Sequence, residues 1–304
     1  MVEVINSNIF YHYTESNHYL TVRSPLLKNQ ITIITRKIRA YTMKVTFIES
    51  SDNLLHSGTE WENLQHKINI EQPDILITNE MPFGRWLAEK KTFNKMNSDA
   101  SITAHDYGMD ALKKLNTPII ISSRPVQVND KLANEAFALI DGKYIFSHHK
   151  HYFPEEPGFY EATWFRTGKT DFNVIKTNKL NIGILLCTEL MFNEWARHYR
   201  HQGAHLIAVP RATGQDAEQW KTAAAMAAIV SGCYVVSSNR VGNCNDQLIF
   251  GGKGFAFAPD GSLISETSPD NPILSFDLDL GFVENQQNNY PCYVRESGFN
   301  PKFV

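Results

Sequence analysis

Cysteine is scarce in this chain, and its four cysteines, Cys187, Cys233, Cys244 and Cys292, show no CxxC spacing. This scarcity argues against a disulfide framework and against a zinc site, and it favours a reducing compartment. We therefore expect a cytoplasmic protein without a bound metal ion.

Long apolar runs and a strong charge of one sign are also missing. No stretch approaches the roughly 18 apolar residues of a membrane-spanning helix. The formal net charge is −3, so we expect neither nucleic acid nor an anionic membrane as a partner. With 304 residues, of which 42% are hydrophobic and 20% charged, the chain can bury a large core and has the composition of an ordinary globular protein.

Strand-like and helix-like segments alternate along the chain from residue 43 onward. Apolar runs with β-branched residues predict strands, and apolar residues at helical spacing predict helices. The predicted strands are 43–49, 74–78, 118–122, 137–150 with a hairpin turn at 141–142, 183–186, 206–209, 234–238, 254–259, 262–266 and 273–278. The predicted helices are 57–70, 98–115, 189–201 and 217–231. This alternation predicts an α/β domain that brings distant strands side by side.

Cys187 lies at the junction between one of these strands and the helix that follows it. Residues 180–186 form an apolar, strand-like run, and the residues after the cysteine have helical spacing. A thiol on such a turn lies near the positive end of the helix, and that field favours the thiolate. Most buried cysteines are inert, but this position is typical of a nucleophile.

Two charged residues end other predicted strands. Glu80 ends the strand at 74–78, and Lys150 ends the second arm of the predicted hairpin. A cysteine hydrolase needs a base for its thiol and a donor for the oxyanion. Glu80, Lys150 and Cys187 are therefore candidates for the base, the oxyanion donor and the nucleophile.

Around these three residues the chain resembles the nitrilase superfamily, the carbon–nitrogen hydrolases. The matching segments are 75–84, 150–168 and 183–214, and the likeness runs from about residue 43 to about residue 280. Three departures from the family pattern keep the triad and leave the substrate branch open. They are Asn79 for the usual proline, Thr188 for the common aromatic residue, and Asn193 for the proline of a Pro-Glu pair.

The resemblance implies a four-layer α-β-β-α sandwich, in which two mixed β-sheets face each other. It also implies hydrolysis of a non-peptide carbon–nitrogen bond in a small amide, through a thioester on Cys187 that releases ammonia or an amine and a carboxylic acid. In this mechanism Glu80 moves the protons, while Lys150 and the backbone N–H of Thr188 stabilise the oxyanion. The chemistry requires no metal ion and no organic cofactor.

Two further residues are candidates for the site. Glu161 lies where the family often carries a second glutamate, which would orient Lys150 or the substrate; the alternative is a surface glutamate. Arg211 follows Pro210, at the end of the strand next to that of the nucleophile. Its guanidinium would bind a substrate carboxylate, or it forms a structural ion pair.

Other functions remain open from the sequence. A nitrilase acting on a small nitrile shares the triad, and Glu189 is the acid that true nitrilases tend to carry two residues after the cysteine. A non-catalytic interaction protein with this fold is a further alternative, although the intact triad argues against it. His149 and His151 share one face of a strand, but the spacing offers no third metal ligand.

The resemblance also bears on domain organisation and self-association. We expect residues 43–285 to form the carbon–nitrogen hydrolase domain, residues 1–42 an N-terminal extension, and residues 286–304 a C-terminal tail. The family implies a homodimer or a higher homo-oligomer. The residues Met191, Trp195 and Tyr199 recur at helical spacing, which predicts either an interface on the helix after the nucleophile or simple core packing.

Overall fold

The computed structural model describes residues 42–169, 171–243 and 249–296, together with the backbone of three strands nearer the N-terminus. The chain divides into two compact units, Met1–Thr42 and Met43–Val304. The first unit contains three antiparallel strands, β1 (Val2–Asn6), β2 (Ile9–Thr14) and β3 (Asn17–Val22), paired in chain order. The predicted domain roles stay predictions, and Cys244 and residues 297–304 of the expected tail lie outside the described residues.

Two mixed sheets form the core of the second unit, and one long strand belongs to both; a separate small sheet pairs β9 (Glu155–Glu156) with β10 (Phe159–Tyr160). Their strands are β4 (Thr42–Ser51), β5 (Ile75–Ile77), β6 (Ile119–Val128), β7 (Lys131–Ile140), β8 (Lys143–His149) and β18 (Ile273–Asp279) in the first sheet, and β11 (Ile175–Lys176), β12 (Asn181–Ile184), β13 (Leu206–Pro210), β14 (Tyr234–Asn243), β16 (Phe255–Phe257) and β17 (Leu263–Glu266) in the second. The first half of β14 pairs with β13 and β16. Its second half pairs with β4 and with β15 (Ile249–Gly251). The pairing of β14 with β4 joins the two sheets.

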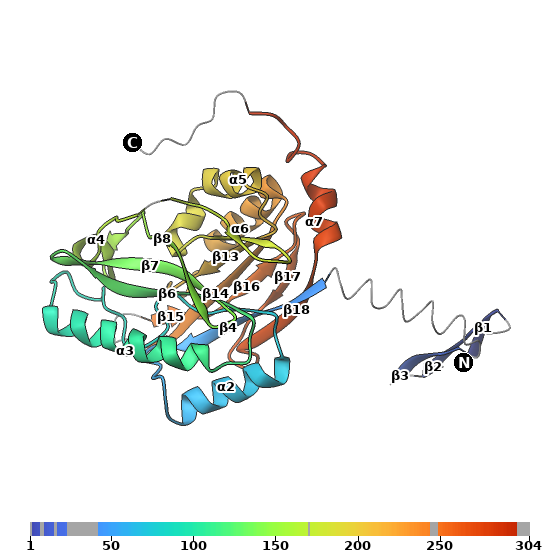
Figure 1. Ribbon diagram of the computed structural model, residues 1–304, viewed down its shortest axis with the longest axis horizontal. Helices are drawn as coiled ribbons and strands as arrows, with labels where there is room; N and C mark the ends of the chain where they lie inside the picture. Colours follow the sequence, from blue (N-terminus) through green and yellow to red (C-terminus); the bar gives the residue numbers. More distant parts are fainter. Residues whose placement is uncertain are drawn as a thin grey trace. The chain divides into compact units, whose positions relative to one another are not determined.

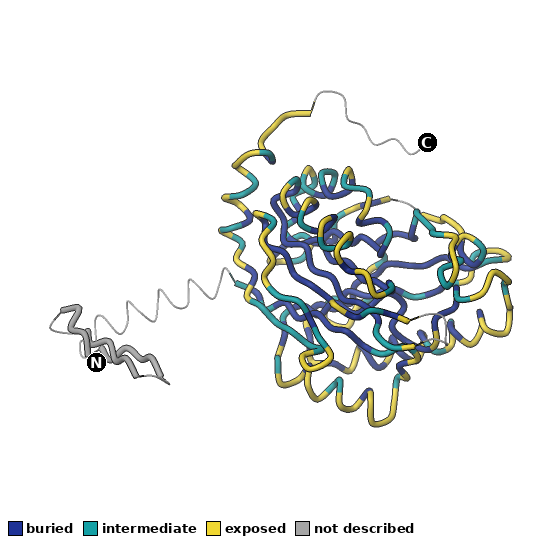
Figure 2. The backbone as a smooth tube through the Cα atoms, turned by 180° about the vertical axis from the view of Figure 1, so that it is seen from behind, coloured by how far each residue is buried: buried dark blue, intermediate teal, exposed yellow. Residues whose placement is uncertain are grey.

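Helices cover the outer face of each sheet and produce four layers (Figure 1). Helices α2 (Thr59–Glu71) and α3 (Lys95–Lys113) pack against the first sheet, whereas α5 (Glu194–His201) and α6 (Glu218–Ser231) pack against the second. Figure 2 shows the strands buried between these more exposed helices. The predicted four-layer α-β-β-α sandwich is confirmed.

The residues of β5 are all apolar because both faces of the strand are buried. Ile75 and Ile77 belong to the core between the two sheets, while Leu76 packs in the cluster under α2 and α3. Successive side chains of a strand point to opposite faces, so a strand covered on both faces is a continuous apolar run. The strand ends at Ile77, and Glu80 follows three residues later, which places the carboxylate just beyond a buried central strand.

The helix predicted over residues 189–201 is wrong in its first part. A short 3₁₀ helix, η1 (Cys187–Met191), comes first, and α5 begins only at Glu194. Phe192 has non-helical φ and ψ of −103° and 81°, which separates the two. The Glu189 carboxylate also turns back to accept from the backbone N–H of Leu186 at 2.7 Å, which keeps the turn tight.

A further helix, α7 (Leu280–Gln287), follows the last strand and was not predicted. It begins after Asp279, whose side chain accepts a hydrogen bond from the backbone N–H of Gly281 at 2.8 Å, as expected of a capping residue. None of the helices in the described ranges combines the length and the apolarity that crossing a bilayer would require.

The aromatic residues of α5 pack inside the second unit. Trp195 and Tyr199 are buried, and the Trp195 ring stacks on Phe172 with 4.1 Å between centroids. The Tyr199 hydroxyl donates to the backbone oxygen of Ile184 at 2.6 Å. The prediction of an interface built on these two side chains is therefore wrong, because the protomer core already covers them, and only Met191 is exposed. Self-association itself stays a prediction.

A buried histidine ties α3 to the loop after Glu80. The Nδ1 of His105 donates to the backbone oxygen of Ser101 at 2.8 Å, and its Nε2 accepts from the backbone N–H of Phe83 at 3.3 Å. Burial lowers the pKa of His105 from 6.5 to about 4. The folded protein therefore holds this ring neutral at a pH where the unfolded chain protonates it.

We expect the protein to lose stability as the pH falls from about 6.5 to about 4, because the unfolded state then binds a proton that the folded state refuses. His105 lowers the free energy of unfolding by about 3 kcal/mol once the pH lies below both pKa values. Urea unfolding at pH 4 to 7 should give a shallower pH slope for His105→Gln than for the wild type. His66→Gln, at an exposed position of α2, is the control. Equal slopes for His105→Gln and the wild type would contradict the prediction.

Candidate active site

The candidate nucleophile lies on a strained turn. Cys187 follows β12 after Leu185 and Leu186 and opens η1. Its φ of +50° lies in the left-handed region, which costs a non-glycine residue about 1 to 3 kcal/mol. The side chain is buried, and the backbone N–H of Leu185 donates to the oxygen of Ala208 on β13 at 3.0 Å. Such strain persists only where the surrounding structure holds the residue in place.

The ammonium group of Lys150 lies between two buried carboxylates. Its Nζ donates to Oε1 of Glu80 at 2.8 Å and to Oε2 of Glu161 at 2.6 Å. All three residues have an exposed fraction of 0%. Burial by itself lowers the pKa of Lys150, but the charges of Glu161 and Glu80 outweigh it and raise the pKa well above its ordinary value. The lysine therefore stays charged inside the protein.

Glu161 begins the short helix α4 (Glu161–Trp164). Its complete burial contradicts the alternative of a surface glutamate. Burial raises the pKa of Glu161 to about 8; Lys150 lowers it, and the charge of Glu80 raises it further. Two carboxylates thus share one ammonium group.

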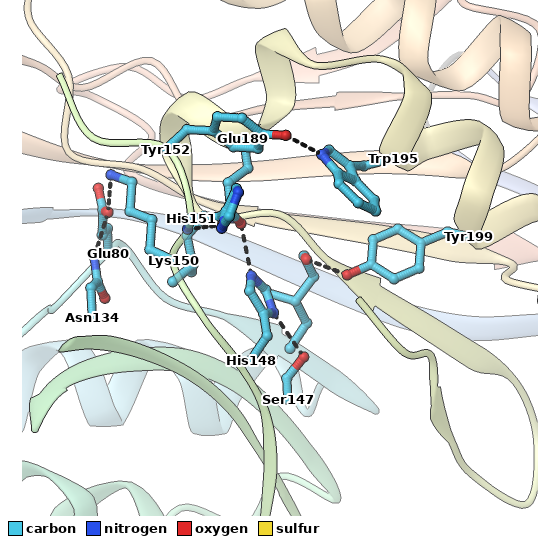
Figure 3. A network of polar contacts seen from close by, with 12 residues as sticks. Glu80, Asn134, Ser147, His148, Lys150, His151, Tyr152, Glu189, Trp195 and Tyr199 are labelled. Carbon is cyan, nitrogen blue, oxygen red and sulfur yellow. Dashed lines mark hydrogen bonds and ion pairs between the residues drawn. The ribbon is translucent and has the colours of Figure 1, made fainter. Parts of the chain in front are cut away.

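Asn134 on β7 contacts both Glu80 and Lys150, and sequence reasoning missed it. Its Nδ2 donates to Oε1 of Glu80 at 2.8 Å, and its backbone oxygen accepts from the N–H of Lys150 at 2.8 Å (Figure 3). The signal in the sequence was the polar pair Asn134-Glu135 inside the otherwise apolar run of β7. A polar residue buried at that point needs a partner, and here the partner is the Glu80 carboxylate.

The surroundings of Cys187 favour the neutral thiol over the thiolate. Burial raises its pKa, and the Glu80 charge adds to the rise, while Lys150 opposes it. The prediction that the following helix favours the thiolate is therefore wrong, because η1 has only five residues and offers little of the field of a full helix. The charges of Glu80, Lys150 and Glu161 all contribute to this pKa, so the sulfur lies within electrostatic reach of the three groups.

Arg211 is packed within the second sheet. Its Nε donates to Ser237 at 2.7 Å, Nη1 to Thr213 at 3.0 Å and Nη2 to the oxygen of Lys253 at 2.8 Å. The guanidinium also lies 4.5 Å from the ring centroid of Phe255. Burial lowers its pKa to about 10. Each nitrogen already has an acceptor, so a contact with the substrate remains a prediction, as does the role of the Thr188 N–H in η1.

Arg240 is a second residue that sequence reasoning missed. Its Nη1 donates to Asp52 at 2.5 Å and to the backbone oxygen of Gly84 at 3.1 Å. Its Nη2 donates to the backbone oxygens of Glu80, at 3.4 Å, and Met81. Met81 has a φ of +43°, so the turn after the base is strained in the same way as the turn of the nucleophile. The hydrogen bonds that Arg240 donates to the backbone hold this turn in place.

The rings of two histidines near Lys150 have carboxylate partners. His149 Nε2 lies 3.3 Å from Oε2 of Glu135, and His148 Nε2 lies 2.8 Å from Oε2 of Glu189. Among the described residues, no three His, Cys, Asp or Glu side chains are grouped as the ligands of a metal ion would be.

Comparison with known proteins decides the family. The model of the family described as carbon-nitrogen hydrolase matches residues 107–287. This chain belongs to the carbon-nitrogen hydrolase family. Lys150, Glu161 and Cys187 lie inside the matched segment, and Glu80 lies before it.

Similar proteins extend this likeness to the fold. The carbon-nitrogen hydrolase from Helicobacter pylori has a TM-score of 0.73 at 21% identity, and the likeness covers 83% of this chain and 94% of that one. An amidase from Nesterenkonia sp. has a TM-score of 0.67 at 18% identity, and the likeness covers 82% of this chain and 96% of that one. The active-site cysteine of that amidase carries the acetamide moiety of fluoroacetamide.

The matches to the curated relatives cover only part of the length of each protein. The N-carbamoylputrescine amidase of Solanum tuberosum is 25% identical over 197 residues, which is 60% of this chain and 66% of that protein. The match to the corresponding Arabidopsis thaliana protein spans 53% of its length. The chain thus spans somewhat less than two thirds of the length of these relatives.

We expect Asn134→Ala to lower kcat about 10- to 100-fold, because Glu80 loses a donor that orients it toward the thiol. Asn134→Asp should lower kcat further, since it places a second carboxylate against Glu80. Steady-state ammonia release together with circular dichroism would test both variants, with Asn116→Ala at an exposed position as the control. Wild-type kcat in Asn134→Ala would show that Asn134 does not orient the base.

Proposed function

We propose that the protein hydrolyses the carbon–nitrogen bond of a small amide and releases ammonia or an amine and a carboxylic acid. The observation that carries this proposal is the buried Lys150 ammonium, bonded to Glu80 and Glu161, whose charges act on the Cys187 thiol. A fully buried lysine held by two carboxylates is costly to build, and a site for a developing negative charge accounts for it.

The acylation step uses each group once. Glu80 takes the proton of the Cys187 sulfur as the sulfur attacks the carbonyl carbon, and the carbonyl electrons move to the oxygen. An ammonium group has three donors, and Lys150 uses two of them for the carboxylates, so the third can bind the oxyanion beside the N–H of Thr188. The carbon–nitrogen bond then breaks, Glu80 protonates the departing nitrogen, and a thioester remains.

The deacylation step repeats the proton transfer with water. Glu80 accepts a proton from a water molecule as its oxygen attacks the thioester carbon. The tetrahedral intermediate collapses, the carbon–sulfur bond breaks, and the sulfur takes back the proton from Glu80. The carboxylic acid leaves, and the thiol returns to its neutral resting form.

Unpaired acceptors favour an amide over a nitrile. Among the described residues, Oε2 of Glu80, Oε1 of Glu161 and Oδ1 of Asn134 are buried without a hydrogen-bond partner. Buried acceptors are satisfied when a ligand supplies N–H donors. An unsubstituted amide or carbamoyl nitrogen carries two such hydrogens, whereas a nitrile nitrogen carries none. The Nesterenkonia amidase, whose active-site cysteine carries the acetamide moiety of fluoroacetamide, and the N-carbamoylputrescine amidase of Solanum tuberosum support the same choice.

We expect Cys187→Ala to abolish turnover without unfolding the protein, because the thiol is the sole nucleophile. Glu80→Gln and Lys150→Ala should each lower kcat on the order of 10²-fold or more. Ammonia release is the measurement, and Cys233→Ala, which removes another buried thiol, is the matched control. Wild-type ammonia release by Cys187→Ala would rule out this mechanism.

We expect the protein to release ammonia from small amides, ω-amides and N-carbamoyl compounds at higher kcat/KM than from nitriles. A panel of these four classes tests this. The physical reason is the set of buried acceptors that only an N–H-bearing substrate satisfies. A preference for nitriles, established with the same chain lengths in each class, would make the protein a nitrilase instead. Cys187→Ala serves as the blank for every compound.

A further inference from the structure

Another buried carboxylate lies next to the proposed nucleophile and has a different set of partners. Glu189, on η1, has an exposed fraction of 0%. Its Oε2 accepts from the backbone N–H of Leu186 at 2.7 Å and from Nε2 of His148 at 2.8 Å. Its Oε1 accepts from the backbone N–H of His151 at 2.8 Å (Figure 3). Both oxygens are therefore engaged.

This engagement separates Glu189 from the two carboxylates that contact Lys150. Glu80 and Glu161 each keep one buried oxygen without a partner among the described residues, so each can receive a reactant. Glu189 has three donors and keeps no free oxygen. Its position two residues after the cysteine does not make it a substrate contact, and its carboxylate serves the protein instead.

The three donors belong to the two segments that carry the reacting groups. Leu186 directly precedes Cys187, while His148 and His151 flank Lys150. The strands before these segments, β12 and β8, have six strands between them in the hydrogen-bonded order, so no ladder of the described strands joins them directly. The Glu189 carboxylate thus connects the nucleophile turn to the lysine segment across the sandwich.

His148 is itself held in one orientation. Its Nδ1 lies 3.1 Å from the hydroxyl of Ser147, and its ring centroid lies 4.5 Å from that of Phe172. Phe172 in turn stacks on Trp195. These contacts aim Nε2 at Glu189, and in Figure 3 the histidine lies between Ser147 and the glutamate.

We propose that Glu189 and His148 form a positioning pair that sets the separation between the Cys187 thiol and the Lys150 ammonium. The inference rests on the proposed function, because the separation matters only if both groups act on one carbonyl. A displacement of about 1 Å in such a site costs on the order of 10²-fold in rate. The bond to Leu186 also closes the turn that keeps Cys187 at positive φ, so one carboxylate supports both the strain and the spacing.

The pair is tested by removing each partner and by restoring one. Glu189→Gln and His148→Leu should each lower kcat about 10- to 100-fold with little change in KM, because the geometry is needed in the transition state rather than for binding. His148→Gln places an amide N–H near the position of Nε2 and should recover much of the loss. Glu194→Gln, an exposed glutamate at the start of α5, is the matched control and should behave as the wild type.

A second measurement does not depend on hydrolysis. The rate at which iodoacetamide alkylates Cys187, followed by peptide mass spectrometry, reports how the base and the thiol are arranged. Glu189→Gln and His148→Leu should lower this rate, with Cys233 in the same sample as the internal reference and thermal unfolding as the check on the fold. If the wild type hydrolyses no amide but these variants still slow alkylation, the positioning pair stands and the proposed function fails.

Two results would overturn the proposal. One is wild-type kcat and wild-type alkylation in folded Glu189→Gln and His148→Leu. The other is a raised KM with unchanged kcat, which would make Glu189 a substrate-binding residue. Should Glu189→Gln fail to fold, the comparison of His148→Leu with His148→Gln decides the question alone.

Discussion

The buried charge of Lys150 is the constraint on which the rest of the site depends. An ammonium group without water needs counter-charges, and Glu80 and Glu161 supply them at hydrogen-bond distance. Burial raises the pKa of both Glu161 and the Cys187 thiol, and the charge of Glu80 adds to each rise. The surroundings of Cys187 therefore favour a neutral thiol at rest.

The residues of the candidate site follow the ends of different strands. Glu80 follows β5, Lys150 follows β8, and Cys187 follows β12, so strands of both sheets contribute. Positive φ at Met81 and Cys187 turns the chain sharply at two of these ends. Asn134, Arg240 and Glu189 then hold the turns through the hydrogen bonds described above. Rigid strands set the approximate positions, and buried polar side chains set the final ones.

The sequence predicted the sandwich and the three strand-end residues because apolar periodicity and order along the chain are local properties. It did not predict Asn134, Arg240 or the pairing of His148 with Glu189, because each depends on which distant segments meet. The thiolate prediction failed for a related reason: a field estimated from the following helix ignores the burial and the carboxylate that the other strands impose. Trp195 and Tyr199 show the same limit, since helical spacing alone does not distinguish a core face from an interface.

The enclosure of the site has a consequence for the kinetics. Glu80, Lys150 and Glu161 are fully buried, and Cys187 is 3% exposed, so a substrate reaches them only after covering side chains move. The apolar cluster that includes Met81, Trp164 and Phe165 adjoins these residues along the chain. Admission and bond cleavage are then separate events with separate rates. A bulky amide with an intrinsically labile bond would be turned over slowly because it enters the site slowly. Selection among substrates would then occur during entry, before the chemical step.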